Sequence, residues 1–130
     1  MPQTTLGNRI LAFDISTPLG TAIATPQSTL CDLAECTIDR LEILIPSGHL
    51  GFTGIALEYG GQRLIPAFQN SAWIIGDNNL LTYVMDFDVG QPVTIKTYNT
   101  GSFVHHHYLR FHVSDIVLPS INRASRLLPL

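Results

Sequence analysis

The strongest constraint on the fold lies in residues 41–59, where two apolar runs flank the break Pro-Ser-Gly-His-Leu-Gly. Before the break, apolar residues recur at every second position, the period of a strand with one buried face. After the break, both faces are largely apolar, which is typical of a strand covered on both sides. Proline cannot donate to a sheet ladder and glycine allows a positive φ, so we predict a tight turn with a defined backbone. The residues expected to define this structural turn are Pro46, Gly48, His49, Gly51 and Gly54.

The same patterning recurs along the chain. About eight short strand-like runs are separated by turn signals, and no sustained helical period is present. The clearest alternation covers residues 80–89, residues 72–75 form a shorter apolar run, and Gly60-Gly61 marks a hairpin. We therefore predict an all-β fold, an antiparallel β-sandwich of jelly-roll or immunoglobulin-like type.

The composition favours one domain that contacts other chains. At 130 residues, the chain is long enough for a single core. Hydrophobic residues make up 45% and charged residues 13%, and a surface so short of charge favours burial against neighbours. The net charge of −3, without a basic stripe, argues against a nucleic-acid partner. No signal-peptide pattern and no apolar run of about 20 residues is present, so we expect folding in a cytoplasm and no membrane partner.

Regular patterning is weakest at the two ends of the chain. We expect residues 1–29 to form an N-terminal arm with one short strand, residues 30–118 to form the sandwich, and residues 119–130 to form a C-terminal tail. Apolar arms of this kind are expected to dock on a neighbour. The expected interface residues are Arg123, Arg126, Leu127 and Leu128 in the tail and, as the alternative, Tyr108, Arg110 and His112 on one face of the last strand.

Five histidines are candidates for a metal site or a pH-responsive contact: His49, His105, His106, His107 and His112. On a strand, His105 and His107 share one face, so two imidazoles can reach a metal from one side. No third ligand is evident, and a strand beginning near His107 would leave its two predecessors in a loop. We expect structural histidines, and no metal or other cofactor.

Three residue sets resemble catalytic or ligand-binding groups, but each lacks part of what the chemistry needs. Asp86 and Asp88 share a strand face, where neighbouring carboxylates are more typical of a solvated edge. Ser47 lies near His49 but has no Gly-x-Ser-x-Gly elbow. Four aromatic residues suggest a sugar-stacking platform, although such spacing is more typical of core and interface. These are Tyr59, Trp73, Tyr83 and Tyr98. We expect no enzymatic activity.

The two cysteines, Cys31 and Cys36, are separated by four residues. A disulfide can close so short a loop but is not implied, and one pair of cysteines is weak support for zinc. We expect reduced, structural cysteines, while the sequence leaves their redox state open.

Several segments between residues 41 and 113 share a specific glycine and proline skeleton. They are Ile-Pro-Ser-Gly-His-Leu-Gly-Phe-Thr-Gly-Ile at 45–55, the Gly-Gly hairpin that ends in Ile-Pro at 65–66, Trp-Ile-Ile-Gly-Asp at 73–77, Thr-Tyr-Asn-Thr-Gly at 97–101 and Tyr-Leu-Arg-Phe at 108–111. Together they resemble a family of small tailed-bacteriophage virion proteins with an Ile-Pro-x-Gly-His-x-Gly-x-Thr-Gly core. The resemblance implies a structural role in the virion, without indicating the layer.

From this resemblance and the apolar ends, we expect a non-enzymatic structural protein of a tailed bacteriophage particle. Its most direct form is a capsid cement or decoration protein, assembled in the host cytoplasm, that binds and stabilises neighbouring subunits through its sandwich and arms. The expected partners are the major capsid protein, or neck or tail subunits, and further copies of the chain. The alternatives are a neck or tail component, or a carbohydrate- or receptor-binding module at a tail or fibre position.

Overall fold

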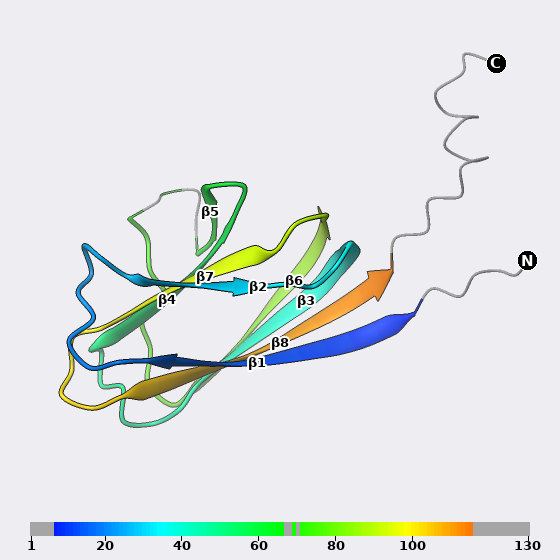
Figure 1. Ribbon diagram of the computed structural model, residues 1–130. Helices are drawn as coiled ribbons and strands as arrows, with labels where there is room; N and C mark the ends of the chain where they lie inside the picture. Colours follow the sequence, from blue (N-terminus) through cyan, green and yellow to red (C-terminus); the bar gives the residue numbers. More distant parts are fainter. Residues whose placement is uncertain (1–6, 67–68, 70, 116–130) are drawn as a thin grey trace, which may run out of the picture.

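Two antiparallel four-stranded sheets pack face to face in a computed structural model of the protein, which describes residues 7–66, 69 and 71–115 (Figure 1). The strands are β1 (Asn8–Thr17), β2 (Gln27–Cys31), β3 (Cys36–Ile45), β4 (Thr53–Tyr59), β5 (Gln62–Ile65), β6 (Asn79–Val89), β7 (Val93–Asn99) and β8 (His105–Asp115). The described residues contain no helix. The predicted all-β sandwich is therefore confirmed.

The strand order distinguishes between the two predicted types of sandwich. Sheet A has the order β1-β8-β3-β6, and sheet B has the order β2-β7-β4-β5. The first strand pairs with the last, the second with the seventh, and so on inward, as in a long hairpin wound into two sheets. The antiparallel pairs are β1–β8, β2–β7, β3–β6 and β4–β5. Only the β4–β5 hairpin stays within its sheet. This is the jelly-roll topology.

The core lies between the sheets and follows the period-2 pattern of the sequence. In β8, alternate side chains point into the core and out to solvent, so one register of the strand sorts apolar from polar residues. The predicted outer row is confirmed, because Tyr108, Arg110 and His112 lie on the outer face, while Leu109, Phe111 and Val113 between them are buried.

The predicted turn after β3 has the expected backbone. Gly48 and Gly51 have φ values of 105° and 81°, in the region that favours glycine. Gly54 is needed for a different reason, because it lies opposite Tyr98 on β7 and the phenol ring covers it. A Cβ atom at position 54 would stand 2.2 Å from a ring carbon of Tyr98. Glycine thus sets the turn geometry at two positions and the close strand packing at the third.

The expected division into an arm at 1–29 and a sandwich from residue 30 is wrong for the described residues. β1 pairs with β8 from Asn8 to Thr17, and β2 pairs with β7. The flanking turns are rich in proline and threonine and suggested an arm, but alternate residues of β1 pack on the core. The tail at 119–130 lies outside the described residues.

Two smaller expectations also need correction. His105 and His106 do not lie in a loop, because β8 begins at His105 and pairs there with the end of β1. The apolar run at 72–75 is not a full strand: it makes a single bridge between Ile74 and Ile55 beside β4. In both cases, pairing with a distant segment decides the outcome, and the local sequence does not show it.

We predict that Gly54→Ala costs more stability than Gly51→Ala. The first change forces the Tyr98 ring to move, an overpacking that costs about 2–3 kcal/mol. The second adds a methyl group in open space at φ 81°, which costs about 1 kcal/mol. Urea denaturation measures both. In a Tyr98→Leu background, the cost of Gly54→Ala falls while that of Gly51→Ala does not; equal costs in both backgrounds would contradict the proposed packing.

We predict that a chain lacking residues 1–29 does not fold cooperatively. The truncation removes β1 from β8 and most of β2 from β7, which exposes backbone groups and core side chains in both sheets. A chain lacking only residues 1–6, which precede β1, is the matched control and keeps a cooperative transition. Thermal unfolding followed by circular dichroism distinguishes them. A melting temperature for residues 30–130 close to that of the parent would restore the arm interpretation.

Candidate interaction surfaces

His49 is the buried centre of the β3–β4 turn. Its side chain is 1% exposed, and both ring nitrogens are hydrogen-bonded. Nε2–H donates to the carbonyl of His106 at 3.0 Å, so Nδ1 is the acceptor and receives the Thr53 hydroxyl at 2.6 Å. The His49 N–H donates to Oδ1 of Asp77 at 2.9 Å. One histidine therefore connects sheet A, sheet B and the β5–β6 loop.

Two further imidazoles pack against His49. Its ring centroid lies 4.4 Å from that of His105 and 4.8 Å from that of His107. His107 is fully buried, and its ring nitrogens have no hydrogen-bond partner among the described residues. Burial, and then the neighbouring histidines, lower the pKa of His107 to about 3. Burial also lowers the pKa of His49, with a smaller contribution from His105.

Both ring nitrogens of His49 are hydrogen-bonded and so are not free to bind a metal ion. Among the described residues, no group of three or more histidine, cysteine or carboxylate side chains is placed to hold a metal ion. His106 points to the opposite face of β8 and meets Asp14, at 2.8 Å from Nδ1 to Oδ1. The rings of His49 and His107 are buried beneath the loops, where they pack against each other.

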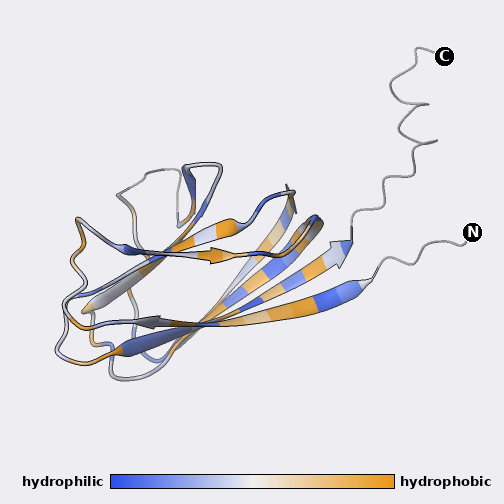
Figure 2. Cartoon of the chain, viewed as in Figure 1, coloured by the Kyte–Doolittle hydropathy of each residue, from blue (hydrophilic) through white to orange (hydrophobic). Residues whose placement is uncertain are grey.

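The loops that cover this cluster form what we call the loop end: the described parts of residues 18–26, 46–52, 66–78 and 100–104, at the left of Figure 2. Their sequences contain one charged residue, Asp77, which accepts the His49 N–H. Large apolar side chains are nevertheless exposed here, with Leu50 at 69% and Phe103 at 74%. The exposed set is Leu19, Ile23, Leu50, Phe52, Ile75, Phe103 and Val104. The loop end is thus a nearly uncharged, apolar surface.

The loop end is held by hydrogen bonds between loops. The Phe52 carbonyl accepts both the N–H and the hydroxyl of Thr100, at 2.9 and 3.0 Å. The Asn99 side chain donates to the carbonyls of Thr17 and Phe103. A hollow of about 200 Å³ lies between Leu50, Phe52, Phe103 and His105, among others. The exposed apolar side chains therefore lie on loops that are held together by hydrogen bonds.

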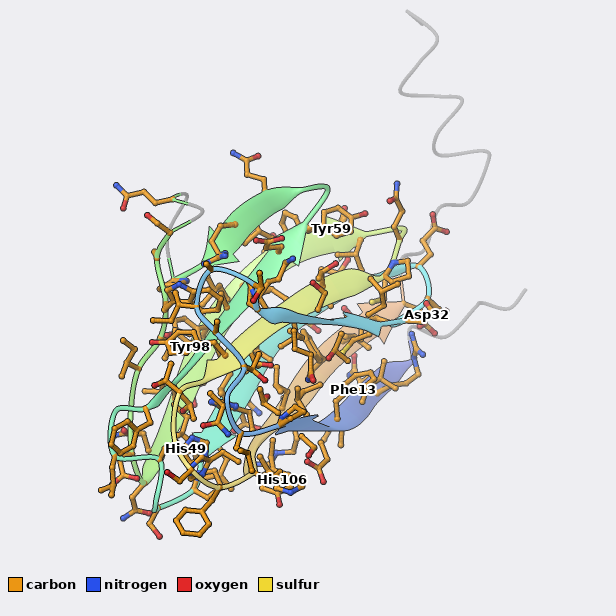
Figure 3. The ribbon with its side chains drawn as sticks, turned by 60° about the vertical axis from the view of Figure 1, so that its left-hand side comes forward. Phe13, Asp32, His49, Tyr59, Tyr98 and His106 are labelled. Carbon is orange, nitrogen blue, oxygen red and sulfur yellow. The ribbon has the colours of Figure 1, made fainter. Side chains whose placement is uncertain are left out.

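The opposite end of the molecule differs in chemistry. Its loops, residues 32–35, 60–61 and 90–92, carry Asp32 and Glu35 together with three glycines. Figure 3 shows Asp32 and His49 at opposite ends of the sandwich. The described chain also begins and ends on the Asp32 side, beyond β1 and β8 (Figure 1). The apolar character is therefore confined to one set of loops.

The predicted interface residues Tyr108, Arg110 and His112 lie together on the outer face of sheet A. Glu42 Oε1 connects two of them, at 3.2 Å from Arg110 Nε and 2.7 Å from His112 Nε2. The hydrogen bond from His112 lowers the pKa of Glu42. Tyr108 and Arg110 line a depression of about 510 Å³ that reaches all four strands, with Leu80 on its far side. Arg123, Arg126, Leu127 and Leu128 lie outside the described residues.

The remaining candidates have structural surroundings. Asp88 accepts the Thr37 hydroxyl at 2.6 Å on the sheet surface. Ser47 is exposed, while both ring nitrogens of His49 are occupied elsewhere. Tyr98 is 4% exposed and meets Trp73 edge to face, so these rings do not form an open sugar platform.

Both cysteines are free thiols in the core. Cys31 closes β2 and Cys36 opens β3, and both side chains are fully buried. Burial raises the pKa of Cys31 to about 11 and also raises the pKa of Cys36. They are therefore unreactive packing residues, as predicted.

Comparison of the sequence with models of known protein families and with curated proteins finds no match. Within the residues that the structure describes, there is no helix that could cross a membrane. Function is therefore inferred from the fold and its two surfaces.

We predict that stability falls as the pH is lowered from 6.5. Above that pH, His107 is neutral in both the folded and the unfolded chain and has no effect on the free energy of unfolding. Between pH 6.5 and about 3, the unfolded chain binds a proton that the folded protein excludes. Each pH unit then lowers the free energy of unfolding by about 1.4 kcal/mol, and His49 acts in the same direction.

Urea titrations at several pH values measure this dependence. His107→Leu removes most of the slope because it removes the titrating group. His106→Leu, on the solvent side of the same strand, is the matched control and keeps the His107 contribution. A slope unchanged in His107→Leu would show that another group controls the acid sensitivity.

Proposed function

We propose that this protein is a structural component of a tailed bacteriophage particle, a capsid cement or decoration protein that binds neighbouring subunits through its loop end. The observation that carries the proposal is the loop end itself, where seven large apolar side chains are exposed among loops with one charged residue. An exposed apolar patch of this kind is typical of protein interaction sites. The phage context comes from the sequence resemblance.

The chemistry of the loop end favours a protein partner. A surface without basic residues gives no attraction to phosphate or to anionic lipid, which proteins contact through lysine and arginine. The hydrogen bonds between the loops already order the backbone beneath the apolar side chains, so less conformational entropy is lost on binding. A cement protein needs such a preformed contact surface and needs no catalytic group. A neck or tail position would use the same surface on a different subunit.

A second candidate function is binding of a carbohydrate or receptor at a tail or fibre position. It is favoured by the outer depression of sheet A, where Tyr108 stacks on His106 with ring centroids 5.9 Å apart. Asp14, Glu42 and Arg110 surround the two rings with groups that can hydrogen-bond to hydroxyls. The surface of the depression is mostly apolar, which is less suited to a sugar than to a protein.

We predict that Leu50→Ser combined with Phe103→Ser abolishes binding to phage particles assembled without this protein. Both side chains are more than half exposed, so the fold is retained while the apolar contact is lost. The matched control is Ile10→Ser with Leu80→Ser, which removes two similarly exposed residues from the outer face of sheet A. Co-sedimentation with particles measures bound protein.

The expected result is loss of co-sedimentation, by at least about tenfold in affinity, for the loop variant alone. Loss for the sheet variant alone would show that the outer face of sheet A, and not the loop end, binds the particle. Equal binding by both variants and the parent would overturn the role of the loop end, and circular dichroism of each variant verifies the fold.

A further inference from the structure

β6 is an unusually open edge of sheet A, fainter at the far side of Figure 1. It has 11 residues and, within the described chain, pairs only with β3. The edge strands of sheet B are shorter, at five residues for β2 and four for β5. The opposite edge of sheet A is partly used, because the carbonyls of Ser16 and Thr17 in β1 accept side-chain hydrogen bonds.

The sequence of β6 does little to block pairing with another strand. Edge strands are commonly protected by lysine, proline, inward-pointing charges or β-bulges. β6 has one such feature, a shift of its register against β3 between Val84 and Phe87. Residues 79–85 contain no charge and no proline, and the only charges of the strand, Asp86 and Asp88, follow them. Val84, at the middle of the strand, is 85% exposed, the highest value among the large apolar side chains of the described residues.

The inner side of β6 is also incompletely covered. Tyr83, Met85 and Phe87 point toward sheet B but are only partly buried. A hollow of about 380 Å³ separates them from Leu64 and Pro66, where short β5 ends. Along β6, therefore, the backbone edge is unpaired among the described residues and the neighbouring core side chains are partly exposed to solvent.

We propose that β6 pairs with β6 of a second copy of this chain, antiparallel about a two-fold axis at Val84, so that the two A sheets form one sheet of eight strands. The strand composition favours this occupant. With Val84 opposite Val84, Asp86 and Asp88 of one copy face residues 79–83 of the other, which carry no charge, and this holds even where the register shift beside Val84 displaces a pair by one residue. A parallel pairing would place like carboxylates side by side, which is unfavourable.

The inner row fits the same register. Tyr83 lies opposite Met85 and Leu81 lies opposite Phe87, so apolar side chains meet across the two-fold axis and extend both cores. The pairing also satisfies free backbone groups along the edge. In such a dimer the two loop ends point in opposite directions, which would suit a protein that connects two separate subunits. The dimer itself does not depend on the proposed function.

The test uses charge at the two-fold axis. Val84→Lys and Val84→Asp each place two like charges opposite one another, and the 85% exposure of Val84 means that the fold is unaffected. Sedimentation equilibrium of the full chain at low salt should give twice the chain mass of 14.3 kDa for the parent and the single mass for each variant. An equimolar mixture of the two variants should recover the double mass, because an ammonium group would then face a carboxylate across the axis of the mixed dimer.

The matched control is Ile10→Lys on β1, an exposed apolar position on the same outer face at the other edge. It should remain dimeric. A parent that is monomeric up to about 500 µM, or a Val84→Lys variant that stays dimeric, would overturn the proposal. The proposal would also be overturned by a dimer that Ile10→Lys breaks and Val84→Lys does not. A mixture of Val84→Lys and Val84→Asp that stays monomeric would overturn it as well.

Discussion

The hydrogen bonds of the buried His49 imidazole are the interaction on which the arrangement of the loops depends. They connect the β3–β4 turn to β8 in sheet A and to Thr53 in sheet B, and the backbone N–H of the same residue holds Asp77 of the β5–β6 loop. Phe52, three residues along, then accepts from Thr100 of the β7–β8 loop. Each bond is modest, but together they turn separate loops into one platform.

The two ends of the sandwich, at opposite ends of the strands, differ in their chemistry. The loop end is apolar and nearly free of charge, whereas the other end carries acidic residues and the start and finish of the described chain. The sheet edges differ in a similar way, because β1 has side-chain partners for its backbone and β6 has none among the described residues. The proposed contact sites are therefore the loops and the sheet edge that the jelly-roll topology leaves uncovered.

Much of the fold could be predicted because strand alternation and glycine geometry are local properties. The outer row of β8 at Tyr108, Arg110 and His112 and the positive φ of the glycines in the break after β3 were both predicted from the residues. The role of β1 was not, because short runs between proline-containing turns look alike in an arm and in a sheet. Its partner β8 lies about a hundred residues away, and only the winding brings the two together.

The candidate surfaces were harder to predict for the same reason. The outward row at Tyr108 follows from alternation alone, but the loop end combines four loops that are distant in the sequence. Its one local signal was the scarcity of charge in each loop. The exposed centre of β6 gave no signal at all, because a strand in the middle of a sheet and one at its edge share the same pattern.

The pairing of the first strand with the last has a consequence for the two chain ends. The Asp115 N–H donates to the Gly7 carbonyl at 3.1 Å, and Arg9 lies 2.9 Å from the Asp115 carboxylate, so entry and exit of the domain are adjacent. Both point away from the loop end (Figure 1). The described chain thus begins and ends at adjacent points, on the side of the molecule remote from the apolar loops. A subunit bound through its loop end would therefore turn Gly7 and Asp115 together away from the surface to which it is bound.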